Sequence, residues 1–175
     1  VESNFQYRFS VKVWWGFIND KLIGPFIIEG RLTAQVYLQF LQEELPSLLE
    51  DVPLETRRQM YYQHDGAPAH FSLAVRTYLN EQFPERWVGR GGPISWPPRS
   101  PDLTPLDYCI WGWMKELVYQ TKSETREQLL RRIENASALI RDSRVQLGNA
   151  TRAIHITSNK CIEMEGGIFE NLLQH

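Results

Sequence analysis

The stretch from residue 60 to residue 79 changes its hydrophobic period from that of a strand to that of a helix within a few residues. Residues 60–63 (MYYQ) are a short apolar and aromatic run that ends at His64-Asp65, and Gly66-Ala67-Pro68 follows as a turn. Pro68 is placed to open a helix, and apolar residues recur from there at helical spacing: Phe71, Val75, Tyr78 and Leu79. A strand that passes through a short turn into a helix is a building unit of α/β folds.

A β-hairpin and a helix are predicted before this segment. Residues 9–17 (FSVKVWWGF) alternate and are rich in β-branched and aromatic side chains, Asn19-Asp20 makes a turn, and residues 22–29 supply a second strand, interrupted by Gly24-Pro25. Thr33 is a plausible cap for a helix that covers one face of the sheet. Its apolar positions are Val36, Tyr37, Phe40, Leu41 and Leu45, and Pro46 kinks or restarts it.

Helices dominate the second half of the sequence. Trp87-Val88 predicts one more short strand, and Arg90-Gly91-Gly92 a loop tip. A helix is expected from Thr104-Pro105, with an apolar face of Leu106, Ile110, Trp113, Met114 and Leu117. Another is expected after Thr121, which has capping-box spacing to Glu124, with a stripe of Leu129, Leu130, Ile133, Leu139 and Ile140. The remainder of the chain, which ends near Ile168-Phe169 and Leu172-Leu173, is expected to hold a last short helix. This order of elements predicts an α/β or α+β layered domain with a mixed sheet.

Composition and net charge limit the classes of protein to which this chain can belong. At 175 residues, 42% of them hydrophobic, the chain can bury one sizeable core, so a single domain is expected. No apolar run approaches the roughly 20 residues of a membrane span, and the first residues lack the features of a secretory signal, so a soluble intracellular protein without membrane contact is expected. Cys109 and Cys161 lack the paired spacing of a metal knuckle. With a net charge of −2, any contact with nucleic acid must come from a local patch or from a part outside this sequence.

Three aspartates could carry chemistry, and each has a simpler interpretation. Asp65 follows a strand and precedes a helix, where it could hold a cation, but Asp-Gly also forms turns in which the side chain caps local amides. Asp107 could be a ligand or a capping carboxylate in the first turn of the helix after Thr104. Asp102 is interpreted as a turn or cap residue.

Two linked motifs resemble the catalytic core of mariner-type DNA transposases of the DDE/D superfamily. In that family the second acid lies in a His-Asp-x-Ala-x-x-His stretch, which here is residues 64–70, and the third ends a Ser-Pro-Asp-Leu-x-Pro-x-(Asp/Glu) stretch, which here is residues 100–107. The resemblance implies that Asp65 is the second acid and Asp107 the third, with Asp102 structural. It extends over roughly residues 9–140, and the wide interval between the two acids places extra length around Arg90-Gly91-Gly92.

Such a resemblance implies a ribonuclease H-like fold, a mixed sheet flanked by helices, and a metal-dependent reaction. Phosphodiester cleavage and strand transfer use two Mg²⁺ (or Mn²⁺) ions, which prefer carboxylate oxygens. Asp65 and Asp107 would hold the metal. His70 could contact a phosphate or orient a ligand, or could simply pack or cap; Arg99 and Lys115 could neutralise DNA phosphates, although solvated surface charge is their alternative. The implied partners are transposon ends and target DNA, the implied assembly is a homodimer in the complete enzyme, and the implied location is the nucleus.

Two parts of the family pattern have no counterpart in this sequence. The first acid lies on a strand before the hairpin, and residues 1–8 contain only Glu2 as an acid. The first, central strand and the preceding helix-turn-helix region are therefore expected to be absent, which makes residues 1–175 a single partial catalytic domain. We expect either a piece of a transposase that is inactive as this chain, or a catalytically dead relic or domesticated module that binds nucleic acid or protein. A ribonuclease H-like nuclease of another family is a third, weaker interpretation.

Overall fold

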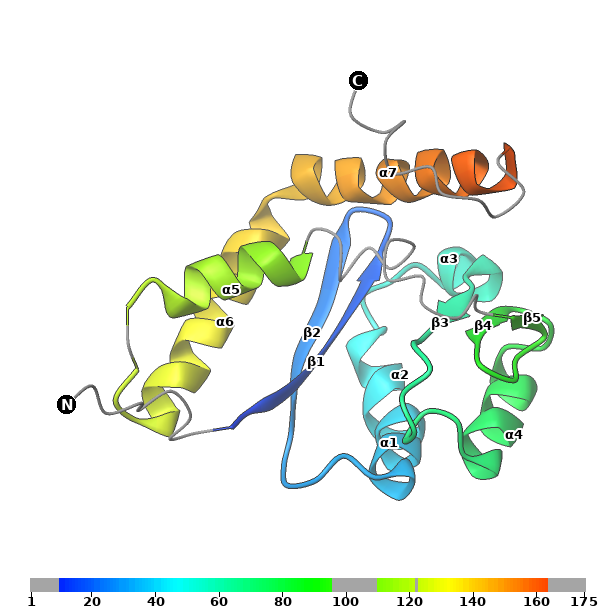
Figure 1. Cartoon of the computed structure of the whole chain (residues 1–175), viewed down its shortest axis with the longest axis horizontal. Helices are drawn as coiled ribbons and strands as arrows, with labels where there is room; N and C mark the ends of the chain where they lie inside the picture. The colour runs from blue at the N-terminus through cyan, green and yellow to red at the C-terminus, as the bar shows by residue number, and fades with distance from the viewer. Residues whose placement is uncertain (1–9, 96–109, 122, 164–175) are drawn as a thin grey trace. The chain divides into compact units, whose positions relative to one another are not determined.

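The computed structural model describes residues 10–95, 110–121 and 123–163 (Figure 1). The chain divides into two compact units. We call Val1–Ile27 together with Ser100–His175 the helical unit, and Ile28–Arg99 the parallel-sheet unit.

A β-hairpin opens the helical unit, as the alternating sequence predicts. Strand β1 (Lys12–Ile18) and strand β2 (Lys21–Ile28) form a two-stranded sheet, and Asn19 at the turn has a φ of 53°. Strand β2 continues through Gly24-Pro25, where the sequence predicted an interruption. Gly24 has a φ of 93°, and a Cβ there would lie 3.1 Å from the backbone oxygen of Trp14. Glycine adopts that conformation without strain, so a side chain at position 24 would be strained.

Three helices accompany the hairpin: α5 (Trp111–Tyr119), α6 (Arg126–Asp142) and α7 (Arg144–Glu163). Their apolar faces form a core with the hairpin, made of Trp15, Leu22, Ile110, Met114, Val118, Leu129, Ile133, Ala136, Ile140 and Leu147. One directed contact lies inside it, because the indole Nε1 of Trp15 donates a hydrogen bond to the hydroxyl of buried Ser137 at 3.0 Å. Edge-to-face packing of Trp15 on Trp111 joins β1 to α5.

Three details of these helices differ from the sequence prediction. The sequence predicted Thr121 as the N-cap of α6, but the N-cap is Thr125, which has the extended backbone that a cap requires. Its hydroxyl accepts a hydrogen bond from the amide of Gln128 at 3.1 Å. Leu139 is 56% exposed, since the buried stripe runs through Ala136 and Ile140 instead. Helix α7 is the helix expected in the last part of the chain, and with 20 residues it is longer than the short helix predicted.

The parallel-sheet unit begins with a broken helix. Thr33 caps α1 (Ala34–Gln39) as predicted, its hydroxyl accepting from the amide of Val36 at 3.2 Å. A π-helical turn, η1 (Phe40–Glu44), then leads into α2 (Leu45–Leu48). Pro46 has no N–H to donate to the carbonyl one turn back, so the helix widens before it and restarts, which confirms the predicted restart. Helix α3 (Leu54–Gln59) precedes the sheet.

Three short parallel strands form the sheet of this unit, in the order β3 (Tyr62–Gln63), β4 (Trp87–Gly89), β5 (Ile94–Ser95). Tyr62 is opposite Trp87, and Val88 is opposite Ile94. Helix α4 (Leu73–Gln82) connects β3 to β4, and its cap is Ser72. The predicted helix opening at Pro68 is therefore wrong: Pro68 belongs to a turn, in which its carbonyl accepts from the amide of Phe71.

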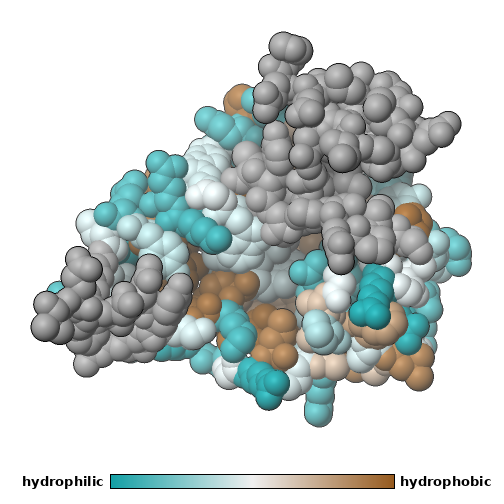
Figure 2. Space-filling model, in the orientation of Figure 1, coloured by the Kyte–Doolittle hydropathy of each residue, from teal (hydrophilic) through white to brown (hydrophobic). Residues whose placement is uncertain are grey.

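The α/β class with flanking helices is thus confirmed, and the described strands form two small sheets (Figure 1). The expected absence of a first strand concerns residues 1–9, and the expected helix start at Thr104-Pro105 is likewise outside the described part of the chain. On the visible surface, hydrophobic residues lie beside hydrophilic ones (Figure 2). Among the helices described, none combines the length and apolarity needed to cross a membrane.

Candidate active site

Asp65 leaves the carboxyl end of β3 and is held in a tight turn. The amide of His64 still pairs with the carbonyl of Val88 at 3.1 Å, so the ladder of the parallel sheet reaches the residue before Asp65. The amide of Ala67 donates to Oδ1 of Asp65 at 3.0 Å, which is the local turn that Asp-Gly predicts. Nδ1 of His70 donates to the same oxygen at 2.7 Å. The turn interpretation of Asp65 is therefore correct for one of its two oxygens.

The second oxygen of Asp65 keeps the carboxylate chemically useful. No described residue donates a hydrogen bond to Oδ2, and the Asp65 side chain is 61% exposed. The hydrogen bond from His70 lowers the pKa of the Asp65 carboxyl below its ordinary value, with a smaller contribution from the Ala67 amide, while partial burial opposes both. Asp65 is consequently ionised at neutral pH, with one oxygen fixed by two donors and the other accessible.

His70 is positioned by a buried aromatic network rather than by a helix. Its ring lies 4.1 Å from that of Tyr37 and is stacked on His64 at 5.0 Å, with an interplanar angle of 9°. The Tyr37 hydroxyl joins Tyr62 at 2.7 Å and Nδ1 of His64 at 3.1 Å. Helix α1 is thereby tied to β3, and the two histidine rings stay parallel beside the Asp65 turn.

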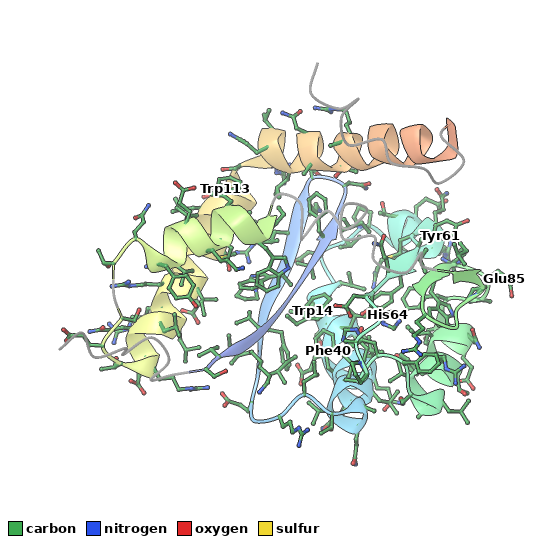
Figure 3. The ribbon with its side chains drawn as sticks, viewed as in Figure 1. Trp14, Phe40, Tyr61, His64, Glu85 and Trp113 are labelled. Carbon is green, nitrogen blue, oxygen red and sulfur yellow. The ribbon has the colours of Figure 1, made fainter. Side chains whose placement is uncertain are left out.

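His64 itself is too buried to act as a charged group. The residue is 8% exposed, and burial, helped by the neighbouring His70, lowers its pKa to about 4. A Cβ on Gly89 would lie 2.5 Å from Cδ2 of His64, so β4 needs glycine at this position to make room for the ring. The ring of Tyr37 packs on both His64 and Phe40 of η1, two residues that are labelled in Figure 3. His64 therefore supports the site as a neutral packing and hydrogen-bonding group.

The other predicted site residues are not brought together with Asp65 by the described structure. Asp107, Arg99 and Asp102 lie outside the described residues. Lys115 is exposed on α5, in the helical unit, whereas Asp65 and His70 belong to the parallel-sheet unit. Of the predicted set, only Asp65 and His70 are seen in contact, and the metal role of Asp65 and Asp107 stays a prediction.

The donors present at Asp65 suit a hard divalent cation. Mg²⁺ and Mn²⁺ prefer carboxylate oxygens and typically take one or two carboxylates in addition to waters and substrate phosphate. The free oxygen of ionised Asp65 is such a ligand. Within the described residues no group of three or more His, Cys, Asp and Glu side chains could hold a metal, so further ligands would have to come from outside the described residues, where Asp107 lies.

Tyr37, Tyr62 and His64 were not singled out from the sequence. A signal did exist, because the alternation of strand residues 61–64 puts Tyr62 and His64 on one face and leaves Tyr61 60% exposed on the other. The partner Tyr37 comes from a helix far away in the sequence, and no local pattern predicts that pairing.

Solved structures define the class of fold to which this geometry belongs. The chain matches the Mos1 transposase catalytic domain solved with raltegravir and Mn at a TM-score of 0.70 and 20% identity, covering 91% of this chain and 83% of that one. It matches the Mos1 mariner paired end complex with Mn at a TM-score of 0.72 and 22% identity, covering 94% of this chain and 47% of that one. The fold is that of the mariner transposase catalytic domain, which confirms the predicted ribonuclease H-like class.

A sequence relative agrees with the structural likeness. The Tc3 transposable element transposase of Caenorhabditis elegans is 27% identical over 110 residues, which is 63% of this chain and 30% of that protein. The chain thus spans about a third of the length of this relative. No protein-family model matches the chain. Together the comparisons confirm the resemblance to mariner-type transposases that the two motifs predicted.

Proposed function

We propose that this chain forms part of a mariner-type transposase and that Asp65 is a ligand of the divalent metal used for DNA cleavage and strand transfer. The observation that carries the proposal is the Asp65 turn: an ionised, 61% exposed carboxylate at the carboxyl end of a parallel strand, with one oxygen fixed by His70 and Ala67. Mos1 catalytic domain structures of the same fold were solved with Mn and with Mg, which supports a divalent metal in this fold.

Each residue then has a role that its chemistry allows. A bound divalent cation would activate the attacking hydroxyl and stabilise the leaving oxygen of the phosphodiester. Asp65 and Asp107 would hold it, and His70 would orient the Asp65 carboxylate through the 2.7 Å hydrogen bond. Arg99 and Lys115 would contact DNA phosphates. We propose Mg²⁺ as the physiological ion, with Mn²⁺ as a substitute, and a homodimer of the complete enzyme acting in the nucleus, where transposon ends and target DNA lie.

The metal site is tested by isothermal titration calorimetry, in which Mn²⁺ is added to the purified chain in the absence of DNA. Asp65→Asn keeps an oxygen that accepts from Ala67, so the turn should persist, and Mn²⁺ affinity should fall by at least about tenfold because a charged ligand is lost. Asp107→Asn should weaken binding similarly. Glu81→Gln is the matched control, since Glu81 is an exposed acid on α4 of the same unit.

Unchanged Mn²⁺ affinity in both aspartate variants would refute the metal assignment. The alternative is a module that binds nucleic acid without cutting it. Two results together would support it: the unchanged chain does not bind Mn²⁺, and Asp65→Asn does not change the affinity for DNA. Strand transfer by this chain alone would overturn the expectation that the first acid is missing.

A further inference from the structure

A second polar cluster lies beside the Asp65 turn and has no part in the proposed metal chemistry. Two arginines contact the same aromatic ring: the guanidinium carbon of Arg76 lies 4.7 Å from the centroid of Phe71, and that of Arg90 lies 4.2 Å from it. Phe71 lies just before α4, Arg76 is on α4, and Arg90 follows β4, so the ring joins the start of α4 to the loop after β4. We call Arg76 and Arg90 the arginine pair.

The hydrogen-bonding capacity of the arginine pair is unused within the described structure. Contact with a ring face stabilises a cation but occupies none of the five N–H donors of a guanidinium. The Nε atom of Arg76 is buried and has no acceptor. Among described residues neither arginine forms an ion pair, whereas His70 pairs with Asp65 and Arg144 with Asp20. Two neighbouring positive charges with open donors favour a bound anion.

The surrounding backbone holds the arginine pair in place. Gly91 has a φ of 74°, and a Cβ there would lie 3.0 Å from Cε2 of Phe71 and 3.1 Å from Cδ of Arg76. The turn after β4 thus packs directly on the ring and the aliphatic stem, and a larger residue at Gly91 would displace them. Preorganised guanidinium groups lose less entropy when they bind a ligand.

The arginine pair is next to the candidate metal ligand. A Cβ on Gly66, the residue after Asp65, would lie 3.9 Å from both Cβ and Cδ of Arg90. A polyanion bound by Arg90 would therefore pass close to the Asp65 carboxylate. Because the chain carries a net charge of −2, attraction to DNA requires a local positive site of this kind.

We propose that Arg76 and Arg90 bind consecutive backbone phosphates of duplex DNA and hold the strand against the Asp65 turn. The planar guanidinium fork matches two phosphate oxygens, and contacts to phosphate position DNA without reading its sequence. This inference rests on the proposed function for the choice of DNA as the polyanion. It adds two binding residues, both outside the two linked motifs.

Fluorescence anisotropy with a labelled DNA duplex, in EDTA and at a series of salt concentrations, tests the proposal without any metal at Asp65. Arg90→Gln should weaken binding about tenfold at 0.1 M salt and reduce the slope of log K against log salt by about 1, because one phosphate contact is lost. Arg90→Lys should recover part of the affinity. Arg58→Gln is the matched control, since Arg58 is an exposed arginine on α3 of the same unit and should change neither quantity.

Arg76→Gln should act in the same direction, and a thermal melt shows whether that partly buried variant stays folded; exposed Arg90 carries the test if it does not. Equal affinities for Arg90→Gln, Arg58→Gln and the unchanged chain would overturn the proposal while leaving DNA binding intact. Failure of the unchanged chain to bind duplex would also overturn it. The Mn²⁺ titration, which contains no DNA, would then still decide the metal site separately.

Discussion

In the helical unit the described buried side chains are apolar apart from Ser137, whereas the parallel-sheet unit buries His64 in a chain of hydrogen bonds with Tyr37 and Tyr62. Apolar packing depends on volume and has no preferred direction, so it stabilises a scaffold without fixing one group at one angle. A hydrogen-bonded network fails if any member turns away. The directional network lies beside Asp65, the residue whose orientation the proposed chemistry needs.

The two kinds of interior should respond differently to substitution. We expect the largest effect in the helical unit, where Ile140→Ala removes a side chain that is fully buried on α6. The cavity should lower the free energy of unfolding by about 2–5 kcal/mol, measured by urea denaturation. Leu139→Ala, on the next residue but 56% exposed, should change it by less than about 0.5 kcal/mol. Equal losses would mean that α6 does not bury the face described.

A smaller effect is expected from the network of the parallel-sheet unit. Tyr37→Phe removes the hydroxyl that joins Tyr62 to His64, so Nδ1 of buried His64 loses its hydrogen bond to Tyr37. The loss of this buried hydrogen bond should lower the free energy of unfolding by about 1–3 kcal/mol. Tyr61→Phe, which removes a hydroxyl from a 60% exposed side chain, is the matched control and should be neutral within about 0.5 kcal/mol. A neutral Tyr37→Phe would show that the network is not needed for stability.

The smallest effect should distinguish the observed cap of α6 from the one that the sequence predicted. Thr125→Ala removes the acceptor of the Gln128 amide and should cost about 0.5–2 kcal/mol. The side chain of Thr121 caps nothing in the described structure, so Thr121→Ala should cost less than Thr125→Ala in the same urea titration. A larger loss for Thr121→Ala than for Thr125→Ala would mean that Thr121, the cap predicted from the sequence, is the true cap of α6.

Local sequence patterns predicted helices, strands and caps correctly where only one residue or segment fitted the pattern. The hairpin, the Thr33 cap, the restart at Pro46 and the strand before Asp65 all depend on neighbours within a few residues. The cap of α6 had two solutions, because Thr121-x-x-Glu124 and Thr125-x-x-Gln128 both have capping-box spacing. Only the extended backbone of Thr125 decided between them.

Helix α7 shows that the intrinsic helix propensity of its residues does not by itself decide how long a helix becomes. It contains Gly148 and several β-branched residues, which are poor helix formers. Leu147 is nevertheless fully buried in the core of the helical unit, and the hydroxyl of Thr151 donates to the carbonyl of Asn19 in the hairpin turn. Tertiary packing therefore stabilises a helix that is longer than the short one predicted from the sequence.

By itself the sequence determined the α/β order of elements, the position of Asp65 after a strand, and the resemblance to mariner-type transposases. Each of these depends on patterns of residues that lie close together along the chain. The tertiary structure alone decided that His70 donates to Asp65, that Tyr37 and His64 support it, and that Arg76 and Arg90 meet on Phe71. The physical reason is that these contacts join helices, strands and turns whose meeting is set by packing of the whole unit rather than by local backbone preference.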